Sequence, residues 1–339
     1  MKFAHRIRLF VSTARHLSWS QIVCRVKRIL RSKWRRLIRK RFVVVDDFIL
    51  SNWQPPCSNL KEPLCQTDVP VSIEKALVRA QKTAELNFKF LNQTIQFERT
   101  PDWHSKEVNQ LWRFHLHYFN YLEDLIVEYR VNSKTQIATA TLRSLVGSWL
   151  DSCDLLAGDA WHPHTISLRL VNWLTAARVM ADSLKAEDAT FLDRLLCSIY
   201  SMARLLEKEI ESDVRGNHIL KNLKALIYAG IAFEGPEPSR WFRSAMDLLR
   251  SETEEQILSD GGHFERNPSY HLVVTKDYLE IGILLRANQR DVPNWLDHAV
   301  EKMLDFIAAI IFSDGQLPLI KDTARGAYPS AFCLLVIGN

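Results

Sequence analysis

The stretch Arg215–Phe233 reads RGNHILKNLKALIYAGIAF and decides the fold class. Its apolar residues recur every three or four positions, which is the period of a helix with one buried face. The same period continues almost without interruption from about residue 105 onward. We therefore predict an all-α protein with helices over residues 107–130, 134–151, 164–184, 188–210, 217–234, 238–257, 267–287 and 294–312.

Short loops between these helices predict antiparallel helical hairpins. The first, third, fifth and seventh helices then begin at the same end of the domain and share one rim. Helix N-termini present free backbone N–H groups, so this rim should favour an anionic ligand. The segments at these starts hold much of the chain's chemically distinctive side chains: Trp103–Tyr118, Trp161–Thr165, Gly216–Asn222 and Asp260–His271.

The composition is that of a folded globular protein. The chain has 339 residues, of which 47% are hydrophobic and 24% charged, and only 11 glycines, which favours long helices over glycine-rich nucleotide loops. Its six cysteines include no CxxC pair, so reduced thiols are expected. No segment reaches the roughly 18 apolar residues of a bilayer span and no signal-peptide core is visible, which predicts a cytoplasmic location.

Charge separates an N-terminal arm from the rest of the chain. Residues 1–41 hold 14 Lys and Arg and no acid, which leaves 30 bases against 39 acids in residues 42–339. The arm has the pattern of a basic amphipathic helix. Packing on the protein body, an anionic membrane surface and an acidic partner all stay open as its role. No nucleic-acid recognition motif is visible, so no nucleic acid is expected.

A connecting region is predicted between the arm and the helical body. Residues 42–95 include four of the twelve prolines and a short strand candidate at Val43–Val45. Proline at this density indicates a linker or irregular packing.

The start of the fifth helix is the first candidate site. Asn217 is well placed as a helix N-cap, which is the simpler interpretation. His218 and Asn222 lie four residues apart and share a helix face, so an imidazole and an amide could point together into a cleft.

The start of the seventh helix is the second candidate site, within DGGHFERNPSYH at residues 260–271. Asn267 can cap this helix with Pro268 as its first residue, which places Tyr270 in the first turn. A purely structural loop stabilised by a Glu265–Arg266 ion pair would have a similar cluster of polar residues in its sequence. One helical hairpin separates this segment from Asn217, and this spacing should return both to the same rim.

Two HxH pairs, His115/His117 and His162/His164, raise a metal hypothesis. We expect no metal, because residues two apart on a helix face different directions and no third ligand is visible at metal spacing. No cofactor is expected either, since no GxGxxG, Walker A, GxSxG or kinase signature occurs. Aromatic rings beside polar groups on one rim suit sugar rings. The candidate substrate contacts are Trp112, His115, His117, Trp161, His162, Arg169, Trp173, Asn222, His263, Glu265, Arg266 and His271.

Four stretches occur in an order that resembles a known family: Gln110–Tyr118, Thr165–Trp173, Gly216–His218 with Asn222–Ala225, and Gln256–His271. Together they resemble the N-terminal portion of the heparinase II/III-like family of polysaccharide lyases, over roughly residues 88–322. The resemblance implies an incomplete α/α toroid over residues 96–322, with a divergent or truncated tail over 323–339.

The resemblance also implies a chemistry, because the family cleaves uronate-containing polysaccharides by β-elimination. Asn217 and His218 fall where the family neutralises the uronate carboxylate, and Tyr270 falls where it places the proton-transferring tyrosine. Removing the proton alpha to a carboxylate builds negative charge that amide and imidazole donors can meet. A tyrosine, with its ordinary pKa near 10, needs nearby positive charge to act as the base, whereas protonation of the leaving oxygen suits it directly, so Tyr270 is expected as the acid or the base.

We therefore expect a polysaccharide lyase-type protein whose partner is an acidic polysaccharide, heparin-, heparan- or alginate-like. The family's C-terminal β-sandwich is missing from this sequence, so the expectation extends to an inactive relative. The alternatives are a non-catalytic module that binds an anionic glycan beside surface-polysaccharide synthesis and, more weakly, glycoside hydrolysis by paired carboxylates among Asp213, Asp260 and Glu265.

Overall fold

The computed structural model describes residues 70–132, 136–153, 158–212, 216–323 and 329–338. The predicted basic arm over 1–41 and the strand candidate at 43–45 lie outside these residues. The described elements follow in the order α4 (Pro70–Ala84), β1 (Asn87–Phe90), β2 (Gln93–Gln96), α5 (Gln110–Tyr118), α6 (Leu122–Val131), α7 (Ile137–Ser152), η1 (Asp159–Trp161), α8 (Pro163–Val179), α9 (Ala181–Glu207), α10 (Gly216–Ala232), α11 (Pro236–Gln256), α12 (Pro268–Ala287), α13 (Asn294–Ile310) and α14 (Ala331–Gly338).

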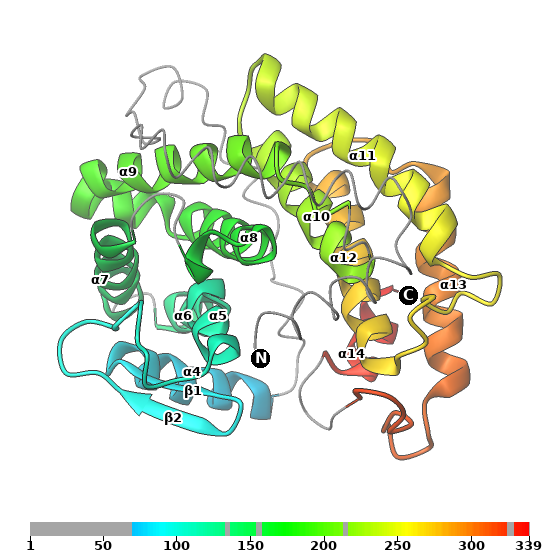
Figure 1. The fold of residues 1–339 in the computed structure, drawn as a ribbon, viewed down its shortest axis with the longest axis horizontal. Coiled ribbons are helices and arrows are strands. Elements are labelled where there is room, and N and C mark those ends of the chain that lie inside the picture. The colour runs from blue at the N-terminus through cyan, green and yellow to red at the C-terminus, as the bar shows by residue number, and fades with distance from the viewer. Residues whose placement is uncertain (1–69, 133–135, 154–157, 213–215, 324–328, 339) are drawn as a thin grey trace, which may run out of the picture.

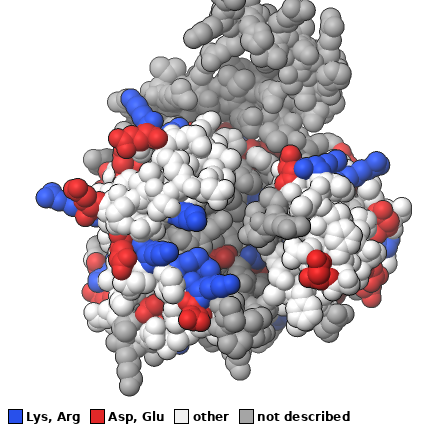
Figure 2. All heavy atoms as spheres, turned by 90° about the horizontal axis from the view of Figure 1, so that it is seen from below, with Lys and Arg blue, Asp and Glu red and all other residues white. Residues whose placement is uncertain are grey.

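The helices follow one another as hairpins around an open ring (Figure 1). Helix α8 packs against α9 and α10, and α10 packs in turn against α11 and α12. Seen from below, the described surface is hollowed between its two halves (Figure 2). The fold is an α/α toroid, which confirms the predicted fold class.

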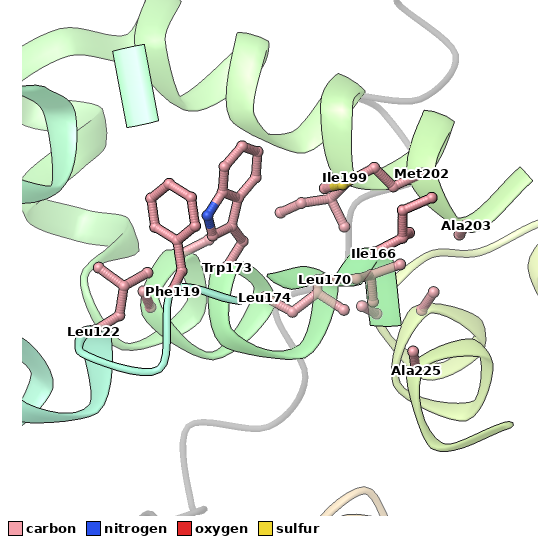
Figure 3. Packing of buried hydrophobic residues seen from close by; sticks show 14 of the residues in the cluster. Phe119, Leu122, Ile166, Leu170, Trp173, Leu174, Ile199, Met202, Ala203 and Ala225 are labelled. Atoms are coloured by element: carbon pink, nitrogen blue, oxygen red, sulfur yellow. The ribbon is translucent and has the colours of Figure 1, made fainter. Parts of the chain in front are cut away.

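Apolar side chains from the helix faces form one large core. Leu170 and Trp173 of α8 pack with Ile199 and Met202 of α9 and with Phe119, which follows α5 (Figure 3). These five side chains are at most 1% exposed. Burying a large apolar side chain contributes roughly 1.5–3 kcal/mol, so this seam between consecutive helices holds the hairpins together.

Two predicted helices have different bounds in the structure. The helix predicted over 107–130 is two helices, because Phe119 adopts a left-handed conformation with φ 60° after α5. The turn predicted near residues 185–187 lies at Met180, between α8 and α9. Asp188 instead kinks α9, with φ −160° and ψ 83°.

The linker predicted over 42–95 is corrected for its described part, which is regular structure. Helix α4 and the antiparallel hairpin β1–β2 occupy residues 70–96, and Ala80 and Phe88 from them enter the core. The hairpin turn places Leu91 and Asn92 at positive φ, as a two-residue turn that matches strand twist requires. In the tail, α14 packs on α12 and α13. None of the described helices is long and apolar enough to cross a membrane.

Candidate active site

The start of α10 and the loop before α12 meet directly. The backbone N–H of Asn217 donates a hydrogen bond to Glu265 Oε1 at 3.1 Å. Gly216, at φ 58°, makes this approach feasible, because a Cβ on it would lie 2.4 Å from the same carboxylate oxygen. The two segments predicted to share a rim therefore do so. The alternative ion pair between Glu265 and Arg266 does not occur among the described contacts, where Glu265 faces α10.

The start of α12 has the predicted cap. The side chain of Asn267 accepts hydrogen bonds from the backbone N–H groups of Ser269 and Tyr270, at 2.9 and 3.2 Å, and Pro268 occupies the first helical position. Tyr270 lies in this first turn and is partly exposed. The cap fixes the backbone that presents the Tyr270 phenol.

Histidines from two helix starts gather around one buried acid, Glu211. His218 Nδ1 lies 3.3 Å from Glu211 Oε1, and His162 Nε2 lies 3.8 Å from the same oxygen. The His164 ring stacks on the His218 ring with centroids 4.2 Å apart. His162 is the N-cap of α8, with extended backbone, and His164 lies in the first turn of that helix, so both imidazoles lie at the start of α8.

The backbone at His162 differs from the helical geometry assumed for the HxH pairs. Two histidines separated by one residue face different directions only when both are helical, and His162 is not. One ligand atom each from His164, Glu211 and His218 lie within 4.8 Å of one another, so these three residues could hold an ion.

Glu211 was not predicted from sequence, although polar side chains surround it. Its side chain is fully buried, Asn222 Nδ2 donates to its Oε2 at 3.2 Å, and its backbone N–H donates to Asn222 Oδ1 at 2.8 Å. Burial alone would raise the pKa of Glu211, but the hydrogen bond with His218 and the nearby imidazoles lower it. Burial and the charge of Glu211 together raise the pKa of Tyr118 to about 12. The site therefore contains a buried carboxylate.

Seven of the predicted substrate contacts are corrected by their burial. Each is buried and has structural partners, as when Trp149 Nε1 donates to His117 Nδ1 at 3.0 Å. Asn222 instead supports Glu211, while His271 Nε2 meets the carbonyl of Met303 at 3.0 Å. A side chain without accessible surface cannot touch a polysaccharide. The seven are Trp112, His117, Arg169, Trp173, Asn222, His263 and His271.

Arg169 is a structural residue of the rim. Its guanidinium lies 4.1 Å from the centre of the Trp149 ring and donates to the carbonyl of Ala160 at 2.8 Å. Burial lowers its pKa to about 9. No salt bridge to Arg169 occurs within the described part of the chain, so aromatic faces and carbonyls stabilise this cation.

The other predicted site residues retain accessible surface. Arg266 is exposed, at φ 51°, and the side chain of His162 is 40% exposed. These residues stay candidates for contact with a ligand. They are Asn217, His218, Tyr270, His115, Trp161, His162, Glu265 and Arg266.

A cavity of about 170 Å³ lies between α6, α8, α10 and α12. Ser167 and Lys221, one turn beyond the histidine cluster on α8 and α10, belong to its lining. A row of alternating charges runs along it, since Lys221 and Lys224 both donate to Asp277 Oδ1 at 2.8 Å, and Lys224 also contacts Glu280. Lys276 continues the row, 3.6 Å from both Glu280 and Glu123.

Comparison with known proteins agrees with this architecture. The family described as heparinase II/III N-terminus matches residues 48–331. The heparin-sulfate lyase of Bacteroides stercoris is 25% identical over 300 residues, covering 80% of this chain and 43% of that protein. The heparin-sulfate lyase of Pedobacter heparinus is 26% identical over 166 residues, covering 48% of this chain and 25% of that protein. This chain thus spans less than half the length of these relatives.

Solved structures show the same fold. A crystal structure of heparinase III superposes with a TM-score of 0.66 at 17% identity, covering 82% of this chain and 50% of that one. The heparan sulfate lyase of Pedobacter heparinus superposes with a TM-score of 0.60 at 20% identity, covering 79% and 43%.

The fold and the rim define a helical toroid of the kind found in polysaccharide lyases. More specifically, the chain belongs to the heparinase II/III family, by its match to the N-terminal domain of that family.

Proposed function

We propose that this chain is the toroid of a polysaccharide lyase-type protein that acts on a uronate-containing polysaccharide by β-elimination. The observation on which the proposal rests is the hydrogen bond from Asn217 N–H to Glu265, which ties the start of α10 to the loop that leads into the Tyr270 turn. The heparin-sulfate lyase names of its relatives support an acidic polysaccharide as the ligand class.

The reaction suits the residue types at this rim. A base removes the proton alpha to the uronate carboxylate, the electron pair forms a carbon–carbon double bond, and the glycosidic carbon–oxygen bond breaks. Negative charge builds on the carboxylate meanwhile, and the Asn217 amide and the His218 imidazole are donors suited to it. The Tyr270 phenol returns a proton to the leaving oxygen.

The direct test incubates the purified chain with heparan sulfate, heparin and alginate and follows the ultraviolet absorbance of the unsaturated uronate end. We expect Tyr270→Phe and Asn217→Ala each to lower turnover by roughly 10²-fold or more. Tyr129→Phe is the matched control, because the Tyr129 phenol forms a hydrogen bond with the Ser183 hydroxyl at 2.8 Å on another part of the toroid. This variant should leave turnover unchanged.

Absence of product with every polymer would exclude lyase activity for this chain. Affinity for one of these polymers without product, weakened by Asn217→Ala, would instead support the alternative of an anionic-glycan-binding module. Equal turnover in the Tyr270→Phe and Tyr129→Phe variants would reject the role given to Tyr270.

A further inference from the structure

The imidazole of His218 lies between the protein interior and the rim. Its Nδ1 is 3.3 Å from Oε1 of Glu211, whose side chain is fully buried. The His218 side chain as a whole is 36% exposed. The two ring nitrogens point in different directions, so Nδ1 meets the interior and Nε2 points away from Glu211.

The charge of Glu211 decides which nitrogen of His218 carries the proton. Burial raises the pKa of Glu211, but the hydrogen bond with His218 and the nearby imidazoles lower it overall, so the side chain is a carboxylate at neutral pH. A carboxylate has only acceptors, so His218 Nδ1 is the donor in this contact. In the neutral ring, Nε2 is then the unprotonated nitrogen.

This tautomer restricts how His218 can meet an anion. A ring that already donates from Nδ1 can donate from Nε2 only when it holds a second proton, as an imidazolium. The Glu211 carboxylate compensates that positive charge from inside the protein. The pair therefore suits His218 to meet a carboxylate on which negative charge builds.

Glu211 is itself held rigidly. Asn222 Nδ2 donates to Glu211 Oε2 at 3.2 Å, and the backbone N–H of Glu211 donates to Asn222 Oδ1 at 2.8 Å. Asn222 Nδ2 also donates to the hydroxyl of Ser167 on α8 at 2.9 Å, and Asn222 is fully buried. Supporting hydrogen bonds of this kind fix the orientation of a side chain that acts on a ligand.

Other titratable groups surround His218, and none of them takes the place of Glu211 at Nδ1. His162 Nε2 is 3.8 Å from Glu211 Oε1, which is longer than a hydrogen bond. The His164 ring stacks on His218, and burial lowers the pKa of His164 to about 3, so it stays neutral. The remaining groups are Tyr118, which contacts His164 edge-on, Lys221, one turn further along α10, and Glu265, at the N–H of Asn217.

We propose that Glu211 is a positioning residue for the reaction proposed above. It holds the Nδ1–H of His218, directs Nε2 toward the substrate carboxylate and supports the imidazolium form. This role rests on the proposed function, because Glu211 is fully buried and acts through His218. The contact itself can be measured without a polysaccharide.

Nitrogen-15 NMR of the full chain, labelled at histidine, tests the contact. The His218 signals are identified by their loss in His218→Gln. We expect the neutral ring of the unchanged chain to carry its proton on Nδ1. In Glu211→Gln the proton should move to Nε2, because Asn222 Nδ2 keeps the Gln oxygen on its own side and turns the Gln amide N–H toward His218.

Turnover separates positioning from a structural role. Glu211→Gln keeps the shape of the side chain and removes its charge, so kcat should fall roughly tenfold or more while KM changes less. Glu301→Gln is the matched control, because Glu301 lies 3.7 Å from Nδ1 of His298 on the exposed surface of α13. This variant should leave the His218 signals and turnover unchanged.

A proton on Nε2 of the neutral His218 ring in the unchanged chain would overturn the proposal, and this measurement does not depend on the folding of any variant. Equal kcat in Glu211→Gln and Glu301→Gln would overturn the role of Glu211 in turnover and leave the proposed function standing. A proton on Nδ1 without product from any polymer would overturn the proposed function, and with it the role of Glu211 in turnover, although the contact would stand.

Discussion

Gly216 is the residue whose backbone decides how closely the two candidate segments approach. Its φ of 58° is unfavourable for residues with a Cβ, and a Cβ would displace Glu265 from the Asn217 N–H. We expect Gly216→Ala to lower the free energy of unfolding by about 1–2 kcal/mol, measured in urea. Turnover should fall at least about tenfold, because small displacements of reacting groups slow catalysis strongly.

Gly147 offers the matched control for this substitution. It lies inside α7, and a Cβ on it would meet nothing within 4 Å. Gly147→Ala should therefore be neutral or stabilising by up to about 1 kcal/mol. Equal losses of stability at the two positions would show that Gly216 has no special role.

For single residues, the sequence predicts which side chains have suitable chemistry, but it does not predict as well which of them are exposed to a ligand. Asn217, His218 and Tyr270 lie with accessible surface at helix starts, where the sequence placed them. Arg169 and Trp173 have equally suitable chemistry but are fully buried. Their side chains fall on the inner face of α8, and a helical period does not say whether a polar residue on that face reaches a cleft or a core.

The cap of α12 is an element whose effect on stability and on activity can be separated. Asn267 accepts from the first-turn N–H groups of Ser269 and Tyr270. Asn267→Ala should cost about 1 kcal/mol in unfolding free energy, because the first turn loses its acceptor. Fraying of this turn moves the Tyr270 phenol, so we also expect turnover to fall.

A second helix cap provides the comparison. Asn109 caps α5 in the same way, accepting from the backbone N–H of Trp112 at 2.8 Å. Asn109→Ala should cost a similar amount of stability, on the order of 1 kcal/mol, and leave turnover unchanged. A loss of turnover that is equal in both variants would trace the effect to general destabilisation.

Whole elements were predictable where local signals exist. The Asn267–Pro268 start of α12 is such a signal, and the structure confirms it. The break at Phe119 was missed because phenylalanine rarely adopts positive φ and gives no warning of it. The β1–β2 hairpin was missed because its four-residue strands are too short to show a period, and its turn residues Leu91 and Asn92 lack the usual glycine.

The molecule as a whole should lose stability in mild acid. His117, His263 and His271 are buried, and burial lowers the pKa of His117 to about 3 and those of the other two to about 4. An unfolded histidine binds its proton near 6.5, so below that value the unfolded chain binds more protons than the folded chain. The free energy of unfolding therefore decreases as the pH is lowered below 6.5. The decrease is about 1.4 kcal/mol per pH unit for each histidine and ends at the pKa of that histidine in the folded protein.

Urea unfolding on both sides of pH 6.5 measures this dependence. The free energy of unfolding should be nearly constant above 6.5, as far as these histidines determine it, and should drop steeply below it. His271→Gln removes one titrating group and keeps a donor for the Met303 carbonyl, so its slope should be shallower than that of the unchanged chain. Identical slopes would mean that His271 is protonated in the folded protein.

At this scale the sequence predicted the toroid and the meeting of the α10 and α12 starts. It did not predict Glu211. This acid lies seven residues before His218, and no sequence pattern indicates that the two side chains meet. The contact depends on where Glu211 lies against the start of α8, which is a property of tertiary packing. His162 lies at the same acid, because its place as the cap of α8, outside the helix, brings its ring within 3.8 Å of Glu211.

The alternating charges along the toroid cavity restrict how this lineage can vary. Asp277 serves both Lys221 and Lys224, so Asp277→Asn leaves two ammonium groups with one fewer counter-ion and should destabilise the chain by roughly 3 kcal/mol in urea. Replacing Asp277 and Lys224 together by leucine and methionine should cost less than the single change. Substitutions in the toroid cavity are thus expected to accumulate as compensating pairs. A designer who reshapes the cavity has to replace an acid and its basic partner together.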